Sequence, residues 1–385
     1  MELLQELVDL SHHYGAGTDW VIGGGGNTSI KSEDHMWVKA SGTTLAAIRP
    51  EQFVQMERSK LDAIWRKRYP QDSARREAHA LQDLLDARSQ AQATIRPSVE
   101  TLMHALFPHR LVVHTHPTLI NGLTCAQEGE RACAELFGDR AVWIPTIEPG
   151  YTLANQIATL VARWREHHDG AWPQVLIMQN HGITVAAETT AEIHDLHQGL
   201  VGLVRSRIDR KPDVADLRPP ELLMQNQTTV AAAVADAVGT GTDALQVAAF
   251  HNAELAARGA NPAAFAAVSS AFTPDHIVYS GYRPCYVAAP AGESVWPQAI
   301  RTAIRDYHAG SGIAPKIVVL QGLGALAVAT NERKVRLAQL LFTDSLKIAG
   351  YTGAFGGPQF MPADQIDFIR GWEVEAFREQ QSTGG

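Results

Sequence analysis

Arg110-Leu-Val-Val-His114-Thr-His116-Pro117 is the stretch of this 385-residue sequence that decides its fold and its chemistry. Apolar and β-branched residues lead into a proline, and this pattern predicts a short strand. Side chains of a strand alternate between its two faces, so we expect His114 and His116 to project from the same side. Two imidazoles on one rigid strand form half of a transition-metal site.

Two further segments could complete that site. Upstream, Pro97-Ser98 predicts the start of a helix with Glu100 in its first turn. Downstream, His181 lies in a turn between two apolar runs that predict a strand pair over Val175–Ala187. Three histidines and one glutamate would chelate a metal and also supply an acid–base carboxylate. The alternative is that the histidines only pack or cap, and the agreement of spacing, strand context and Glu100 disfavours it.

The composition restricts the classes of function. Apolar residues make up 45% and charged residues 19%, as in ordinary globular proteins, and the net charge of −8 argues against a nucleic-acid binder. No apolar run approaches the length of a membrane span, and the N-terminus lacks the basic segment of a signal peptide. Cys125, Cys133 and Cys285 show no paired spacing, which favours buried, reduced thiols. We therefore expect a cytoplasmic protein without a nucleic-acid or membrane partner.

A glycine run and a hydroxyl-rich turn suggest an anion site near the N-terminus. Gly23–Gly26 precede Asn27-Thr28-Ser29, and a strand over Met36–Lys39 leads into Ser41-Gly42-Thr43-Thr44. Glycines can take positive φ angles and turn several N–H groups toward one point. A flexible surface loop is the ordinary alternative.

Taken together, these pieces resemble the class II aldolase/adducin family. The matching motifs run in family order over roughly residues 1–210: Gly-Gly-Asn27-Thr-Ser, Lys39-Ala-Ser41-Gly42, Pro97-Ser98-Val99-Glu100, His114-Thr-His116 and Gln179-Asn-His181-Gly. The resemblance is closest to the aldolase half of bifunctional rhamnulose-1-phosphate aldolase/dehydrogenases, whose dehydrogenase half we expect to be missing here. It implies a three-layer αβα fold around a mixed, mostly antiparallel sheet.

The resemblance also implies a metal-dependent carbon–carbon lyase. The expected reaction is reversible retro-aldol cleavage of a ketose, first of all a ketose 1-phosphate, to a dihydroxyacetone-type fragment and an aldehyde. His114, His116, His181 and Glu100 would bind Zn²⁺, or else Mn²⁺ or Co²⁺, and Glu100 would also be the catalytic acid–base. A homo-oligomer acting on a small sugar or sugar phosphate is expected.

The resemblance assigns a further group to substrate or phosphate binding: Asn27, Lys39, Ser41, Gly42 and Ser98. The chain departs from the family at Val99, where single-domain aldolases carry a second hydroxyl. Tyr151 and Tyr282 are additional candidates for contact with substrate.

Other chemistries within the family remain open. The sugar-phosphate 4-epimerases carry Asp at the position of Glu100, which favours an aldolase here. Dehydratases and decarboxylases keep similar metal ligands. Adducin-like members are non-enzymatic scaffolds that lack the metal histidines, so the histidines of this chain argue against that class.

The second part of the chain predicts a degenerate copy of the same fold. Prolines near residue 212 mark a linker between domains at 1–211 and 212–385. Val175–Ala187 aligns without gaps on Ile317–Ala329, with Leu323 in the place of His181, and Asp34–Gly42 resembles Asp275–Gly281. No His-x-His occurs in this part, so we expect a domain without metal ligands.

A permissive dinucleotide fingerprint, Gly322-Leu-Gly324-Ala-Leu-Ala327, lies in the same region. We expect a second strand after it and a helix only from the Asn331 cap, so nucleotide binding is rejected. The remaining patterns predict helices over 1–14, in much of 50–95, from Gly150, from Thr190 and over 366–377, an edge strand within 141–149, and a loop over 353–357.

Overall fold

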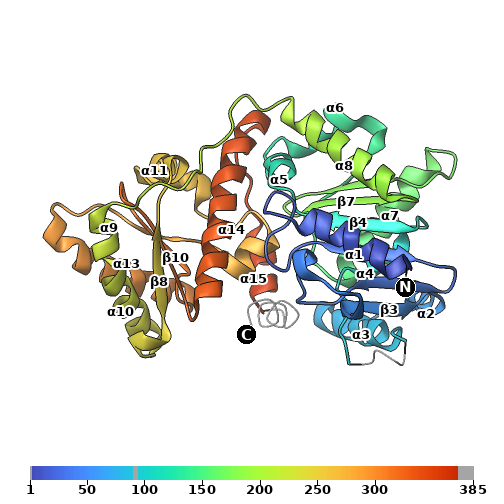
Figure 1. Ribbon diagram of the computed structural model, residues 1–385, viewed down its shortest axis with the longest axis horizontal. Coiled ribbons are helices and arrows are strands. Elements are labelled where there is room, and N and C mark those ends of the chain that lie inside the picture. The colour runs from blue at the N-terminus through green and yellow to red at the C-terminus, as the bar shows by residue number, and fades with distance from the viewer. Residues whose placement is uncertain (1, 90–93, 372–385) are drawn as a thin grey trace. The chain divides into compact units, whose positions relative to one another are not determined.

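The structure, a computed structural model, describes residues 2–89 and 94–371 and divides into two compact units (Figure 1). Unit 1 contains the chain up to Thr124 and Glu128–Arg207, and unit 2 contains Cys125–Gln127 and Ile208–Arg370. Within the described residues, no helix combines the length and the apolar character that crossing a membrane would require.

Unit 1 is built on one mixed sheet. Its strands are β1 (Asn27–Lys31), β2 (His35–Lys39), β3 (Phe53–Glu57), β4 (Leu111–Thr115), β5 (Val142–Ile144), β6 (Val175–Met178) and β7 (Gly182–Ala187). Their order is β3-β2-β1-β4-β7-β6-β5. All neighbours are antiparallel except β5 and β6. The mixed, mostly antiparallel sheet that the sequence predicts is therefore confirmed.

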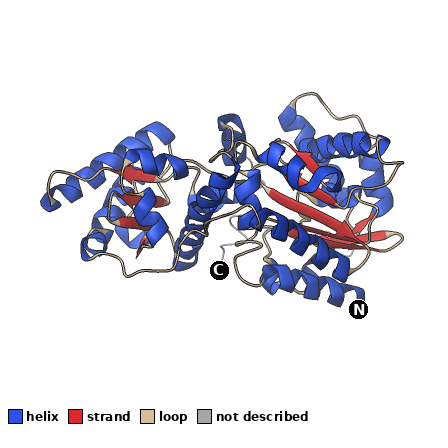
Figure 2. Cartoon of the chain, turned by 90° about the horizontal axis from the view of Figure 1, so that it is seen from above, coloured by secondary structure: helices blue, strands red, loops and turns tan. Residues whose placement is uncertain are grey.

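Helices cover both faces of this sheet (Figure 2). They are α1 (Glu2–Gly15), α2 (Arg58–Ile64), α3 (Ser73–Asp86), α4 (Thr101–Leu106), α5 (Thr118–Thr124), α6 (Gly129–Phe137), α7 (Tyr151–Glu166) and α8 (Thr190–Arg205). On one face, Ser11 of α1 bonds Thr28 of β1 at 2.6 Å. On the other, Ile157 of α7 packs with Leu176 and Met178 of β6. The arrangement is the expected αβα sandwich, and its core lies on both sides of the strands.

Most elements of unit 1 follow the sequence pattern, with two corrections. The strand at 111–115, the 175–187 hairpin and the helices at 2–15, 151–166 and 190–205 are confirmed. Residues 53–57, inside the region predicted to be largely helical, form strand β3, because their alternating side chains pair with β2. Glu100 is the N-cap of α4 and not a residue of its first turn.

Unit 2 contains a smaller sheet. Its strands are β8 (Gln246–Phe250), β9 (Cys285–Val287), β10 (Ile317–Leu320) and β11 (Gly324–Ala329), and its helices are α9 (Glu221–Gln225), α10 (Gln227–Val238), α11 (Ala253–Arg258), α12 (Pro262–Phe265), α13 (Trp296–Ser311), α14 (Glu332–Tyr351) and α15 (Ala363–Gly371). The order β8-β11-β10-β9 repeats β4-β7-β6-β5 of unit 1, with the same strand directions. The predicted second copy therefore holds for these four strands.

The repeat extends to individual hydrogen bonds. In unit 1 the Gln179 side-chain oxygen accepts from Thr146 N at 3.2 Å, and in unit 2 the Gln321 oxygen accepts from Ala289 N at 3.0 Å. The next residue of each hairpin turn has a positive φ, 54° at Asn180 and 73° at Gly322. Such agreement between backbone and side chains indicates one shared hairpin geometry.

Unit 2 also corrects part of the sequence alignment. His35–Lys39 is strand β2, whereas His276–Ser280 is a π-helical segment, so the proposed likeness of 34–42 to 275–281 is wrong. The described part of unit 2 has no counterpart of β1 to β3. Gly322 and Gly324 lie at the β10–β11 hairpin and α14 begins after the Asn331 cap, as expected.

Two smaller outcomes concern the C-terminal end and the cysteines. Residues 352–355 form a short 3₁₀ turn that overlaps the expected loop at 353–357, and the final helix is described up to Gly371, so 372–377 lie outside the described residues. The three cysteines are buried thiols that form no disulfide among the described residues. Burial raises the pKa of Cys133 and of Cys285 to about 12, so these two thiols stay protonated and unreactive.

Leu346→Ala tests the core of unit 2. Leu346 is fully buried between α14 and the sheet, so its truncation should lower the free energy of unfolding by about 2–5 kcal/mol. Leu217→Ala is the control, because Leu217 is 49% exposed and should change stability by less than about 0.5 kcal/mol. Urea unfolding followed by circular dichroism measures both, and equal effects would contradict the assigned core.

Candidate metal centre

His114 occupies the middle of the sheet of unit 1. It lies on β4 between Asn27 of β1 and Thr184 of β7 and is fully buried. Its Nδ1 lies 2.9 Å from the Ile183 carbonyl oxygen and 3.1 Å from Thr184 Oγ1. A carbonyl can only accept, so Nδ1 carries a proton and Nε2 is the ring atom that faces the other histidines, as in histidines that bind metals through Nε2.

His116 and His181 reach the same point from two turns. His116 directly follows β4, and its backbone N donates to the Trp20 carbonyl at 2.9 Å. His181 closes the β6–β7 turn, where Asn180 takes a positive φ and its side-chain oxygen accepts from Thr146 Oγ1 at 2.9 Å. Both turns are thus held by hydrogen bonds on either side of the histidine.

Glu100 comes from the start of α4. Its backbone N donates to Ser98 Oγ at 3.2 Å, and the Asn27 side-chain N–H₂ donates to its Oε2. The Glu100 side chain is 13% exposed. The residue therefore enters the site as a positioned, largely buried carboxylate.

The four side chains converge on one point. Their candidate ligand atoms all lie within 4.8 Å of one another. His114 Nε2 is 2.9 Å from His116 Nε2 and 3.3 Å from His181 Nε2, and Glu100 Oε1 is 3.3 Å from Nε2 of His114 and of His181. Ligands at about 2.1 Å from a tetrahedral Zn²⁺ are about 3.4 Å apart, so the donor set fits such an ion.

The charges at this point also favour a cation. Burial alone would raise the pKa of the Glu100 carboxyl, but the neighbouring His114 and His181 outweigh it and hold that pKa well below its usual value. Burial lowers the pKa of His104 to about 3, with repulsion from His114 adding to the shift, so His104 stays neutral. Its Nδ1 bonds Ser29 Oγ at 2.8 Å.

The residues assigned to phosphate binding lie around this site, but their visible contacts are internal. Lys39 Nζ donates to the carbonyls of Gly24 and Thr43 at 3.1 and 2.7 Å, so it ties the glycine loop to the following turn. Ser98 N donates to the Lys39 carbonyl, and Ser41 N to that of Arg96. Gly42 takes a φ of 81° in this turn. Their role toward a phosphate stays a prediction.

The tyrosine candidates have structural contacts. The Tyr151 ring lies 4.6 Å from that of Tyr69, and its backbone N donates to Glu77. Tyr282 belongs to unit 2, where Arg370 lies 4.5 Å from its ring centre. Their contact with substrate stays a prediction.

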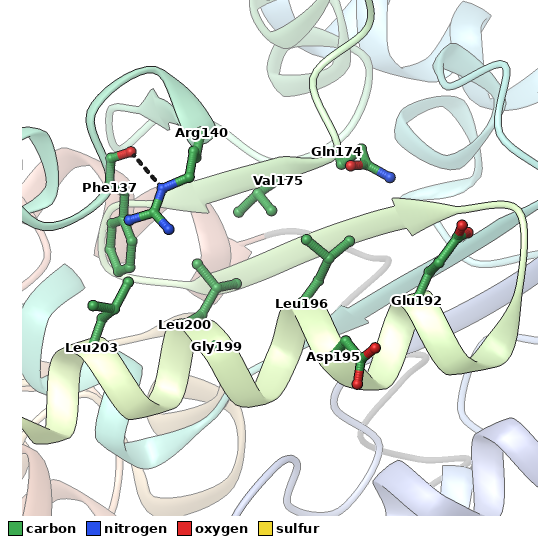
Figure 3. A pocket seen from close by; sticks show the side chains of 10 residues that line it. All are labelled: Phe137, Arg140, Gln174, Val175, Glu192, Asp195, Leu196, Gly199, Leu200 and Leu203. Carbon is green, nitrogen blue, oxygen red and sulfur yellow. Dashed lines mark hydrogen bonds between the residues drawn. The ribbon is translucent and has the colours of Figure 1, made fainter.

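A separate cavity of about 410 Å³ lies elsewhere in unit 1 (Figure 3). Leu196, Leu200 and Leu203 of α8 line it, facing Val175 and Arg140. Val175 begins β6, whereas His181 follows the end of that strand, so the cavity and the metal centre lie toward opposite ends of β6. No member of the metal centre lines this cavity.

The position in unit 2 that corresponds to the metal centre lacks two of the three histidines. The strand register places Ala249 where unit 1 has His114, and Leu323 where it has His181. His251 stands in the place of His116, a match that the sequence comparison missed because β4 and β8 share no motif. Leu223 and Leu323 belong to the apolar core there.

Sequence reasoning also missed the partners that orient the histidines. The Ile183 carbonyl and Thr184 Oγ1 contact the His114 ring through the pairing of β4 with β7, and the carbonyl of Trp20, which precedes β1, accepts from the backbone N of His116. The contact of Asn27 with Glu100 was missed as well, because the resemblance assigned Asn27 to phosphate. The alternation of His114 and His116 was the one local signal available.

Unit 1 is thus a mixed sheet between two helical layers, with three imidazoles and a carboxylate that could together hold a metal ion. The family model for the Class II Aldolase and Adducin N-terminal domain matches residues 5–205. The chain belongs to this family.

Other proteins are similar over part or all of the chain. The "Uncharacterized oxidoreductase YuxG" of Bacillus subtilis (strain 168) is 24% identical over 97% of this chain, which spans 58% of that relative's length. The N-terminal class II aldolase domain of a conserved protein from Thermoplasma acidophilum is 26% identical, with a TM-score of 0.44, over 53% of this chain and 92% of its own. L-fuculose-1-phosphate aldolase from Thermus thermophilus is 14% identical, with a TM-score of 0.33. The match covers 53% of this chain and 91% of the aldolase.

Gly182→Ala should disrupt the metal centre. A Cβ there would lie 2.3 Å from the Thr115 carbonyl oxygen and 3.0 Å from the His116 ring, so β7 or His116 must move. We expect loss of stability by more than about 1 kcal/mol together with weaker Co²⁺ binding, measured by urea unfolding and visible absorption. Gly202→Ala is the control: its Cβ meets nothing within 4 Å inside α8, and it should stabilise slightly. A Gly182→Ala protein with normal Co²⁺ affinity would refute the close approach.

Single alanine substitutions of His114, His116 or His181 should each abolish stable metal binding. Each variant keeps only two imidazoles beside the Glu100 carboxylate, so the ion is held more weakly and should be lost during gel filtration. Metal content after gel filtration, measured by inductively coupled plasma mass spectrometry, reports the loss. His197→Ala is the control, because His197 is buried and bonds Thr115 Oγ1 and the Ile193 carbonyl outside the centre. Equal metal content in all four variants would exclude the assigned ligands.

Proposed function

We propose that the protein is a metal-dependent aldolase that reversibly cleaves a ketose to a dihydroxyacetone-type fragment and an aldehyde. The observation that carries the proposal is the convergence of three imidazole Nε2 atoms with Glu100 Oε1 within 4.8 Å. Membership of the class II aldolase/adducin family supports it, and the metal histidines argue against an adducin-like scaffold.

The four residues would hold a divalent ion, and Zn²⁺ suits their donor set best. When bound, the ion would act as a Lewis acid toward the ketose carbonyl oxygen, where negative charge develops as the C3–C4 bond breaks. As metal ligands, the three imidazoles would be neutral. The Glu100 carboxylate would then be the one ligand whose negative charge offsets the positive charge of the ion.

Glu100 is the acid–base group of this proposal. Cleavage of C3–C4 converts the C4 hydroxyl into the aldehyde carbonyl, which releases the hydroxyl proton, and leaves an electron pair on the three-carbon fragment, which must then take up a proton at C3. In the direction of bond formation, the same proton leaves C3 and passes to the Glu100 carboxylate. The backbone N–H to Ser98 Oγ and the amide N–H₂ of Asn27 hold Glu100 in place for both directions.

The family resemblance supports two further parts of the proposal. The substrate is a small sugar or sugar phosphate, and the protein forms a homo-oligomer. Light scattering of the purified protein tests the second part directly.

Glu100→Gln should keep the metal but lose about 10²- to 10⁴-fold in turnover, because the amide cannot accept and return the proton. The assay follows condensation of dihydroxyacetone, with and without phosphate, with a panel of aldehydes, using the Zn²⁺-loaded protein. Metal content of the variant is measured in parallel. Full turnover of the Gln variant would show that Glu100 is not the acid–base group. If the wild-type protein condenses no aldehyde of the panel, the aldolase proposal is refuted.

A further inference from the structure

One buried polar atom beside the metal centre has no partner. Asn27 is 5% exposed and lies on β1 opposite His114. Its side-chain oxygen Oδ1 is buried and accepts no hydrogen bond from any described residue. An unmet hydrogen bond of a buried polar atom destabilises the fold, so an atom of this kind next to a candidate site calls for a ligand that satisfies it.

The chemistry of Glu100 determines which end of the Asn27 amide is unpartnered. A carboxylate that serves as a metal ligand is ionised and can only accept hydrogen bonds. The amide nitrogen must therefore face Glu100 Oε2, as it does here, and the oxygen is the remaining atom. Both atoms share one carbon, so the unpartnered acceptor lies next to the carboxylate of the site.

An unpartnered acceptor selects its ligand by polarity. A hydroxyl group can donate to it, whereas the ionised oxygens of a phosphate are themselves acceptors and are repelled. The resemblance to known aldolases assigns Asn27 to phosphate, and the contacts of its amide point to the opposite preference.

Two neighbouring features agree with this preference. Lys39, the cation closest in sequence to the hydroxyl-rich turn, directs its ammonium at the carbonyls of Gly24 and Thr43. Val99 provides no hydroxyl where single-domain aldolases have one. Of the groups that would hold a phosphate, the Lys39 ammonium thus bonds backbone carbonyls, and the second hydroxyl is replaced by the apolar side chain of Val99.

We propose that Asn27 is a specificity-determining residue: its Oδ1 accepts a hydrogen bond from a free substrate hydroxyl next to the metal-chelating atoms, and its Nδ2 positions Glu100. The proposal rests on the proposed function of the same site. It names the substrate class as ketoses whose C1 hydroxyl is free, in preference to ketose 1-phosphates.

Three hydroxamic acids test this inference without turnover. Each chelates the Co²⁺-loaded protein through the same two oxygen atoms. Acetohydroxamate carries a methyl group, glycolohydroxamate adds a hydroxyl, and phosphoglycolohydroxamate replaces that hydroxyl with a phosphate. Visible absorption of Co²⁺ gives the Kd of each ligand for the wild-type protein, Asn27→Ala and Asn27→Asp.

The wild-type protein should bind glycolohydroxamate on the order of ten- to a hundredfold more tightly than acetohydroxamate, the range expected for filling a buried unmet acceptor. Asn27→Ala should remove this preference, so that glycolohydroxamate and acetohydroxamate bind with about equal Kd even if the lost contact with Glu100 weakens both. Asn27→Asp keeps an acceptor, so it should keep the hydroxyl preference, while a second carboxylate beside Glu100 lowers turnover.

Ser29→Ala is the matched control. Ser29 lies two residues along the same strand, is fully buried, and bonds His104 without touching Glu100. Its removal should lower stability and leave the hydroxyl preference intact. Loss of the preference in Ser29→Ala would show that the effect comes from disturbing β1 and would overturn the role of Asn27.

Other outcomes would also overturn the inference. If Asn27→Ala weakens phosphoglycolohydroxamate more than glycolohydroxamate, Asn27 contacts phosphate. If it weakens all three ligands equally, Asn27 serves only the metal or a bound water. The proposed function is tested separately by the condensation assay: hydroxyl-selective binding without condensation would refute the aldolase and leave Asn27 in its role.

Discussion

The antiparallel pairing of β4 with β7 is the constraint on which the metal centre depends. It sets His114 against Thr184 and brings the Ile183 carbonyl to Nδ1 of His114. It also brings the turn that carries His181 to the end of the strand that carries His116. A shift of register by one residue would turn His114 to the opposite face of the sheet. Gly182 secures the register, because no side chain fits between it and Thr115.

A buried carboxylate among imidazoles is the main electrostatic feature of unit 1. An isolated buried charge is strongly unfavourable, so its surroundings must supply hydrogen bonds or a cation. Asn27 and the histidines do so here, and a divalent ion would do so more completely. Nearby, burial keeps His104 neutral, and the Lys39 ammonium donates to the Gly24 and Thr43 carbonyls.

Unit 2 shows which parts of this framework belong to the fold and which to the chemistry. It keeps the strand order, the directions and the Gln321 hydrogen bond of the hairpin. It replaces two of the three histidines with Ala249 and Leu323 and fills the position with apolar side chains. A fold can thus persist after its site is lost, since packing and backbone pairing do not require the ligands.

Local pattern determined much of the fold and of the candidate site. Alternation around His114 and His116, the apolar runs on either side of His181 and the cap at Asn331 are short-range signals, and the structure has the strands and helices that they predict. Sequence alone missed strand β3, whose five residues lie between helix-prone segments, and it misaligned 275–281, where a chance likeness carried no information on pairing.

Tertiary structure alone decided which groups meet. The distances between Glu100 and the histidines, the donation of the Asn27 amide to Glu100 and the engagement of Lys39 with carbonyls join residues that are far apart in the chain. The match of His251 to His116 also appears only through strand register. The physical reason is that residue type and spacing govern the local backbone, whereas hydrogen-bond partners and burial depend on how separate segments pack.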